Sequence, residues 1–138
     1  MISTLLLALA LQSSFDARAR EYHCSAPETQ SQLEMNMCAE LDFERADLDL
    51  NRVYREEVES ARQADREIDR ASDQRPTSEA VLRQAQRAWL TFRDAQCTYE
   101  GYGEARGGSM EPMIYSGCRA RLTRERIAQL GQSVEAAH

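Results

Sequence analysis

The side chains with the clearest chemical potential in this 138-residue chain are four cysteines, Cys24, Cys38, Cys97 and Cys118. Their separations of 14, 59 and 21 residues match no C-x-x-C pattern of a metal site or redox centre. In an exported chain, an even number of cysteines predicts two disulfides, for which three pairings are possible. We favour Cys24 with Cys38 and Cys97 with Cys118, because this pairing closes the two shorter loops.

Groups that could act as acids, bases or nucleophiles are poorly placed for catalysis. The two histidines, His23 and His138, lie near the ends of the expected mature chain, where a catalytic geometry is hard to hold. Neighbouring acids such as Asp47 and Asp49 point apart on a helix. The chain has no phosphate-binding loop motif. The sequence therefore predicts no enzyme, no catalytic or metal-binding residue and no cofactor.

The N-terminal segment predicts export. Residues 2–11 form an apolar run that is too short to span a bilayer but fits the apolar region of a signal peptide. Ala17 and Ala19 then provide the small residues that a signal peptidase requires, with cleavage after Ala19. We therefore expect a signal peptide at residues 1–19 and one domain at residues 20–138.

The expected location follows from the same segment. The residues before Cys24 are not the small ones of a lipid-attachment site, so we expect a periplasmic or secreted protein without a membrane anchor after signal cleavage. The alternative is a buried N-terminal helix, since no basic residue precedes the apolar run.

Charge is distributed unevenly along the chain, whose net charge is −6. Residues 28–73 hold 14 acids and 6 arginines, whereas residues 74–138 hold 7 acids and 9 arginines. An acidic first half disfavours nucleic acid and favours a basic protein partner by long-range attraction. The alternative is a solvated helix face that only maintains solubility.

Hydrophobic spacing predicts an all-α fold. Apolar residues recur with helical periodicity in three stretches, and the strong helix breakers cluster between them. The first helix can begin with a capping box at Ser25 or at Thr29, and the third should end at Gly131. We expect a small antiparallel helical hairpin plus a third packed helix, stapled by two disulfides, with helices at about 25–71, 78–100 and 111–130 and a loop at 101–112.

The second helix is expected to supply much of the core. Its apolar residues should be buried against the other two helices, with tryptophan as the largest. The residues expected to be buried are Val81, Leu82, Ala85, Trp89, Phe92 and Cys97.

A polar stripe on the first two helices predicts how they pair. An antiparallel hairpin about Pro76 places these residues opposite one another in three pairs, Asp47 with Arg93, Asn51 with Trp89, and Tyr54 with Gln86. The first pair should form a charge-assisted hydrogen bond. The stripe could line a ligand pocket, but we interpret it as an internal polar network, because buried charged pairs more often fix how helices pack.

Several segments in a specific order resemble a known bacterial family. They are residues 86–97 (QRAWLTFRDAQC), 34–39 (EMNMCA), 46–47, 50–54 and 107–109, followed by Cys118. The chain resembles the lysozyme inhibitor LprI-like family, long catalogued as a domain of unknown function, over residues 24–130. The resemblance implies an exported, disulfide-bonded helical domain and, for the name-giving member, inhibition of lysozyme, a basic secreted enzyme that cuts peptidoglycan. The absence of a lipid-attachment motif departs from that member.

Two surfaces could carry such inhibition. One is a set of acids on the first helix, and the other is the glycine-rich loop, inserting Ser109 into an active-site cleft. The candidate acids are Glu40, Glu44, Glu56 and Glu59. The alternative function is a periplasmic binding module for another partner, without lysozyme inhibition.

Overall fold

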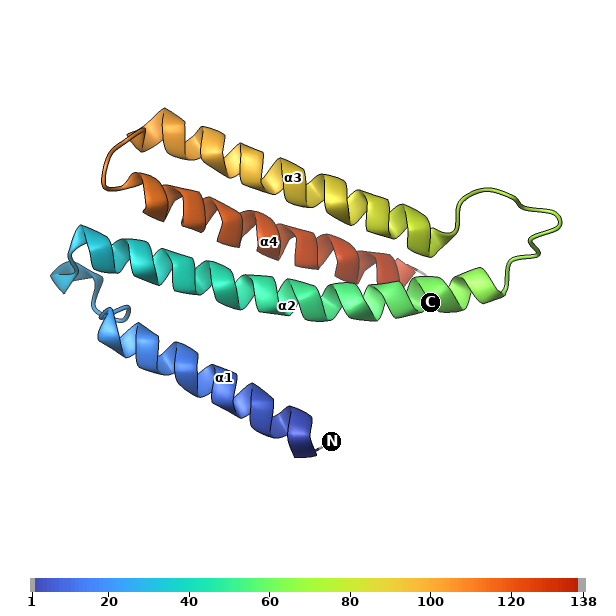
Figure 1. Ribbon diagram of the computed structural model, residues 1–138, viewed down its shortest axis with the longest axis horizontal. Helices are drawn as coiled ribbons and strands as arrows, with labels where there is room; N and C mark the ends of the chain where they lie inside the picture. Colours follow the sequence, from blue (N-terminus) through green and yellow to red (C-terminus); the bar gives the residue numbers. More distant parts are fainter. Residues whose placement is uncertain (1, 137–138) are drawn as a thin grey trace.

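The computed structural model describes residues 2–136, and these form helices and no strand (Figure 1). The elements, in chain order, are α1 (Ile2–Glu21), a short 3-10 turn η1 (Pro27–Thr29), α2 (Gln32–Arg66), α3 (Ser78–Ala105) and α4 (Glu111–Ala136). The predicted all-α class is confirmed. None of the helices within residues 2–136 combines the length and apolarity needed to cross a membrane.

Three helices form the body of the molecule. The most extensive contact joins α2 to α4, and α3 packs mainly against α4 and less against α2. Figure 1 shows α4 between α3 and α2, with α1 lying outside along α2. α2 and α3 therefore do not form a closed two-helix hairpin, because α4 lies between them and packs against both.

Two disulfides join these helices. Cys24 and Cys38 are bonded with Cα atoms 5.7 Å apart and tie the segment after α1 to α2. Cys97 and Cys118 are bonded with Cα atoms 5.4 Å apart and tie α3 to α4. This is the pairing that closes the shorter loops, and the described residues include no free cysteine.

The start of α2 differs from the prediction. Its N-cap is Ser31, whose hydroxyl accepts from the Glu34 N–H while the Glu34 carboxylate accepts from the Ser31 N–H. Ser25 and Thr29 are not caps, because Pro27 and Thr29 belong to η1, after which the chain is extended at Gln30. The capping box lies two residues beyond the later of the two predicted positions.

The other helix ends also shift. α2 stops at Arg66 instead of near residue 71, and α3 continues to Ala105, which shortens the predicted 101–112 loop to residues 106–110. α4 runs through Gly131, so the predicted cap there is wrong. The one described glycine in the left-handed region is Gly107, with φ of 74°, in the short loop.

The core lies where α3 and α4 meet and along the inner face of α2. Its centre is the Cys97–Cys118 bridge with Leu122, against which Trp89 and Tyr115 pack. The predicted burial of α3 is only partly right: Cys97 is fully buried and Leu82 and Trp89 are half-buried, whereas Val81, Ala85 and Phe92 are exposed. These three lie on a face of α3 that no other element covers.

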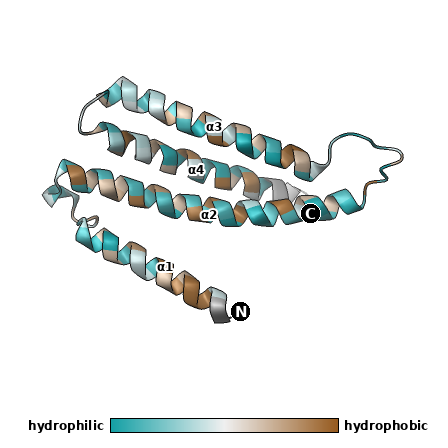
Figure 2. Ribbon diagram, in the orientation of Figure 1, coloured by the Kyte–Doolittle hydropathy of each residue, from teal (hydrophilic) through white to brown (hydrophobic). Residues whose placement is uncertain are grey.

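The N-terminal helix rests on α2. Phe15 is buried, and the Arg18 guanidinium donates two hydrogen bonds to the Glu44 carboxylate, at 2.6 and 3.0 Å. Figure 2 shows apolar residues concentrated in the first half of α1, where the leucines are exposed. Phe15, Asp16 and Arg18, which contact Arg45 and Glu44 of α2, all lie in the second half of α1.

Candidate functional site

Arg93 lies at the centre of the predicted polar stripe. Its side chain is 7% exposed. Nη1 donates to Asp47 Oδ1 at 3.1 Å and to the buried Thr123 hydroxyl at 3.4 Å, and Nε donates to Asp94 Oδ1 at 2.9 Å. The contact predicted between Asp47 and Arg93 is present, and a threonine of α4 completes it.

Arginines and aromatic rings alternate through the interior on both sides of Arg93. Guanidinium carbons lie 3.9–5.9 Å from ring centroids, within the range of cation–π attraction. We call this set the arginine–aromatic column; its members, in order, are Tyr115, Arg119, Phe43, Arg93, Trp89 and Arg126.

The two outer arginines of the column have different partners. Arg119 donates to Glu40 Oε2 at 2.5 Å, and the Ser116 hydroxyl donates to the same oxygen. Arg126 donates to Gln86 Oε1 at 3.0 Å and forms no ion pair among the described residues. Burial lowers the pKa of Arg126. The column is thus joined to α2 by one carboxylate at each of its first two arginines, and its third arginine is joined to α3 by an amide.

The remaining two predicted pairs form no hydrogen bond among the described residues. Asn51 is exposed and donates to Asp47 on its own helix, at 3.4 Å. Gln86 is bound by Arg126 and not by Tyr54. The reason is that α4 lies between α2 and α3 and takes the positions that a two-helix hairpin would leave to Asn51 and Tyr54. The same spacing rule, applied to α4, would have found Arg119, Thr123 and Arg126.

Chemically, the column binds helices together. Its charged groups are occupied by rings, carboxylates, amides or hydroxyls of the same chain, and Arg93 is almost closed to solvent. An arginine stays protonated at any physiological pH and is a poor acid or base. The column supports the fold, and a ligand site must be sought at the surface.

The acids considered for partner binding are occupied by arginines. Glu40 bridges α2 to α4 inside the bundle, and the others lie at the surface. The pKa of Glu44 is lowered by its hydrogen bonds from Arg18. The ion pairs are Glu40 with Arg119, Glu44 with Arg18, Glu56 with Arg52, and Glu59 with Arg62 and Arg66.

The glycine-rich segment, in contrast, is an exposed and well-anchored projection. All residues from 106 to 110 are exposed. The Gly107 N–H donates to Glu111 Oε2 at 2.6 Å, and the Gly108 N–H donates to the Ala105 carbonyl at 2.7 Å. Asn36 at the start of α2 donates to the Ser109 carbonyl at 2.9 Å. This 106–110 loop is therefore held at both its beginning and its end.

Its side chains offer hydrogen-bond donors to a partner. The Arg106 guanidinium carbon lies 4.4 Å from the Tyr102 ring centroid and forms no ion pair among the described residues. Ser109 is exposed, and Met110 is 46% exposed beside it. The predicted Ser109 site is thus at the surface, and Arg106 is a neighbour that the sequence argument missed; an arginine directly before two glycines was the available signal.

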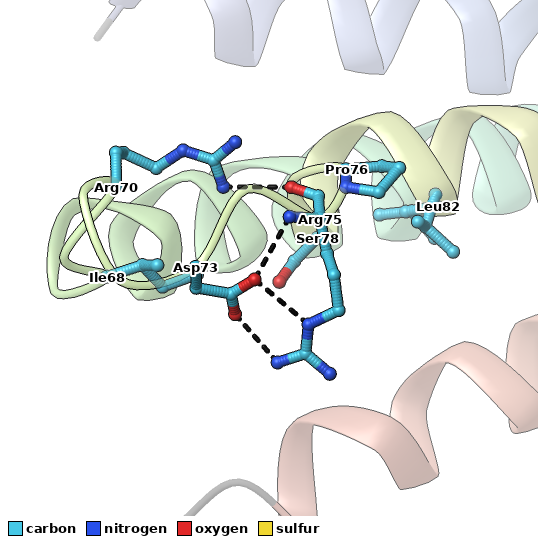
Figure 3. A pocket seen from close by; sticks show the side chains of 8 residues that line it. Ile68, Arg70, Asp73, Arg75, Pro76, Ser78 and Leu82 are labelled. Carbon is cyan, nitrogen blue, oxygen red and sulfur yellow. Dashed lines mark hydrogen bonds and ion pairs between the residues drawn. The ribbon is translucent and has the colours of Figure 1, made fainter.

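A hollow lies at the α2–α3 connection (Figure 3). Arg75 forms two hydrogen bonds to the Asp73 carboxylate, at 2.7 and 2.9 Å, which lower the pKa of Asp73, and Arg70 donates to the Arg75 carbonyl. These contacts hold the connection in place. The hollow is lined by Ile68, Arg70, Asp73, Arg75, Pro76, Ser78, Val81 and Leu82.

The remaining candidate groups are the two histidines and possible metal ligands. His23 is held by Glu34, with Nδ1 2.8 Å from Oε1, so it is better positioned than the sequence suggested. The neighbouring Cys24 is in a disulfide and is therefore not a free thiol. His138 lies outside the described residues. Within those residues, histidine, cysteine and acidic side chains form no group that could hold a metal ion.

Comparison with known proteins places this arrangement in a family. The family model described as "Lysozyme inhibitor LprI" matches residues 24–130, which include both disulfides, the column and the loop. A protein of Rhizobium meliloti (strain 1021), named "Uncharacterized protein R02472", is similar at 40% identity over 131 residues, which is 95% of this chain and 94% of its own. No solved structure matches significantly. The chain belongs to the LprI lysozyme inhibitor family.

Proposed function

We propose that this protein is an exported inhibitor of lysozyme that contacts the enzyme through the 106–110 loop. The family supports a protein partner such as lysozyme. The observation that carries the choice of surface is the contrast between the loop and α2: the loop is exposed and anchored, with unpaired donors, whereas three of the four candidate acids, Glu40, Glu56 and Glu59, are bound to arginines that remain after cleavage.

The chemistry of the target fits the loop. Lysozyme is a glycoside hydrolase, and such enzymes hold two carboxyl groups around the bond they cut. Arg106 brings a guanidinium without an acidic partner, and Ser109 brings a hydroxyl. An arginine can bind a carboxylate through two parallel hydrogen bonds. The loop would thus occupy the cleft by offering donors to its carboxylates.

Net charge has a separate role in this proposal. The chain carries −6, and a basic lysozyme would be attracted to it at long range. Such attraction raises the association rate more than it stabilises the final complex. We therefore expect added salt to slow association, while the loop contacts determine how long the complex lasts.

Export remains part of the proposal. Disulfides are typical of oxidising compartments, in agreement with a periplasmic or secreted location. Cleavage after Ala19 would remove Phe15 and Arg18 from the face of α2 and free the Glu44 carboxylate. The mature protein would then be residues 20–138, still held at its start by the Cys24–Cys38 bond.

The test is hydrolysis of a cell-wall suspension by a chicken-type lysozyme, with and without the purified oxidised protein. Arg106→Ala should weaken inhibition about tenfold or more, since loss of one charged contact at an interface typically costs at least 1.4 kcal/mol. Arg55→Ala is the matched control, because Arg55 is also exposed and unpaired among the described residues but lies on α2.

The outcomes separate the alternatives. Full inhibition by Arg106→Ala, with loss in a Glu56→Ala, Glu59→Ala double variant, would move the contact to α2. No inhibition at a large molar excess would reject lysozyme as the target and leave an envelope binding module with another partner.

A further inference from the structure

An uninterrupted apolar stripe runs along the outer face of α3. Its members recur at alternating intervals of four and three residues, and every one of them is exposed. Exposure reaches 73% for Tyr99, 53% for Phe92 and 51% for Val81. We call this the α3 stripe; it consists of Val81, Ala85, Ala88, Phe92, Ala95, Tyr99 and Tyr102.

The spacing indicates a partner helix. Alternation of four and three gives a repeat of 3.5 residues, which is the pattern of helices that pack along one another as a coiled coil. α3 meets its own bundle through other positions, among them Gln86, Arg93 and Cys97. Among the described helices, α3 packs mainly on α4 and α2, and α1 lies beyond α2 (Figure 1).

We infer that the α3 stripe binds the α3 stripe of a second copy of this chain, with the two helices antiparallel. About a two-fold axis at Phe92, phenylalanine meets phenylalanine, alanine meets alanine beside it, and each tyrosine meets a smaller residue towards the ends of the stripe. The small residues beside the axis and opposite the tyrosines leave room for the large ones, which close packing of a helix interface requires. The resulting pairs across the axis are Phe92 with Phe92, Ala88 with Ala95, Ala85 with Tyr99, and Val81 with Tyr102.

Charge supports a second copy over a basic partner. The stripe contains no charged residue, and the positions flanking its centre are Gln84, Thr91, Gln96 and Thr98, which are uncharged as well. A partner selected by opposite charge would find nothing here to recognise. Two copies, each with a net charge of −6, could approach along this face without placing like charges opposite one another.

The size of the stripe is adequate for a specific contact. It extends over 22 residues from Val81 to Tyr102, or about 31 Å at the helical rise. A contiguous apolar surface of this length is unusual on a monomer and typically marks a protein interface. In an antiparallel pair, the two 106–110 loops would lie at opposite ends of the interface.

The first test is the mass of the purified, oxidised protein in solution, by sedimentation equilibrium at several concentrations. We expect about twice the monomer mass, and a dissociation constant raised at least about tenfold in Phe92→Glu, because a glutamate would be buried at the axis. Tyr99→Glu is a second variant at an even more exposed position, should Phe92→Glu fail to fold. Leu33→Glu is the control, since Leu33 is 68% exposed on α2.

The second test is the register. Oxidation of a variant carrying both Ala85→Cys and Tyr99→Cys should give a covalent dimer, whereas Ala85→Cys alone should give none. A cross-link through Ala85→Cys alone would indicate parallel helices and overturn the proposed pairing. A monomer at all concentrations, or a dimer unaffected by both glutamate variants, would overturn the inference itself.

Discussion

Arginine is used in this protein as a core residue. The Arg93 guanidinium lies 5.0 Å from the Phe43 ring centroid and 5.3 Å from the Trp89 ring centroid, and it donates hydrogen bonds to Asp47 and Asp94 as well. Only a planar, delocalised cation can do this, because an ammonium group offers no flat face to stack. The column thereby contributes both close packing and directional hydrogen bonds at the centre of a small bundle.

Asp47→Ala tests the partner of Arg93. We expect the free energy of unfolding to fall by about 1–3 kcal/mol, since the variant leaves a buried cation with fewer acceptors. The loss should be smaller than for a fully buried ion pair, because Asp47 is 37% exposed and Asp94 still binds Arg93. Urea unfolding measures the change.

Asp49→Ala is the control for that measurement, because Asp49 is exposed two residues away and forms no direct ion pair among the described residues. An Asp47→Ala variant as stable as Asp49→Ala would show that the column does not depend on this carboxylate.

At the residue scale, sequence reasoning found the Asp47–Arg93 contact because both residues lie on helices whose pairing the Pro76 turn fixes. It missed Arg119 and Arg126, since the rotation of α4 about its axis depends on packing against two helices at once. The four acids were placed on the correct helix, but their arginine partners come partly from other helices and could not be assigned by spacing.

Among the elements, the start of α2 is defined by side-chain hydrogen bonds. Ser31 and Glu34 satisfy each other's backbone N–H groups, and His23 also binds the Glu34 carboxylate. The Ser31 N–H is the main reason that the pKa of Glu34 falls from its ordinary value of 4.5 to about 2. The ionised form is therefore the one that caps the helix.

This shift predicts a pH dependence. A carboxyl group with a lowered pKa in the folded state contributes stability that is complete above its ordinary pKa and is lost as the pH falls through the folded value. For Glu34 the loss should occur between about pH 4.5 and pH 2. Glu34→Gln keeps a capping side chain but should flatten stability across this window in acid titrations followed by circular dichroism.

Glu28→Gln provides the comparison, because Glu28 is exposed and has no described partner. If Glu28→Gln flattened the curve as much as Glu34→Gln does, the capping box would not be the source of the acid sensitivity.

The disulfide between α3 and α4 should stabilise the folded protein as a whole. Cys97 is fully buried and Cys118 nearly so, and their bond closes a loop of 21 residues. Replacing both with alanine should lower the free energy of unfolding by about 2–4 kcal/mol, measured in urea. A loss below 0.5 kcal/mol, about the scale of a neutral surface change, would contradict this.

Element boundaries explain where prediction failed. Periodicity identified α2, α3 and α4, since long amphipathic runs give a clear signal. It could not choose which of two apolar faces of α3 enters the core, so Val81 and Phe92 were assigned to the interior. The helix ends at Ala105 and beyond Gly131 were missed because glycine is tolerated within a helix that packing stabilises.

The molecule as a whole has two separate surfaces that could bind partners. The 106–110 loop lies at the end of the bundle where α2 begins, and the α3 stripe runs along one side (Figure 1). Many acids form ion pairs with arginines within the chain, which carries a net charge of −6. Recognition should therefore depend on the shape and donors of the loop, with charge assisting the approach.

The most direct test of the central claim is the rate of cell-wall hydrolysis by a chicken-type lysozyme, titrated with the oxidised protein, with Arg106→Ala and with Arg55→Ala. If the 106–110 loop binds the enzyme, the natural protein and Arg55→Ala should inhibit stoichiometrically, and Arg106→Ala should inhibit about tenfold more weakly. Equal inhibition by all three, or none by any, would contradict it.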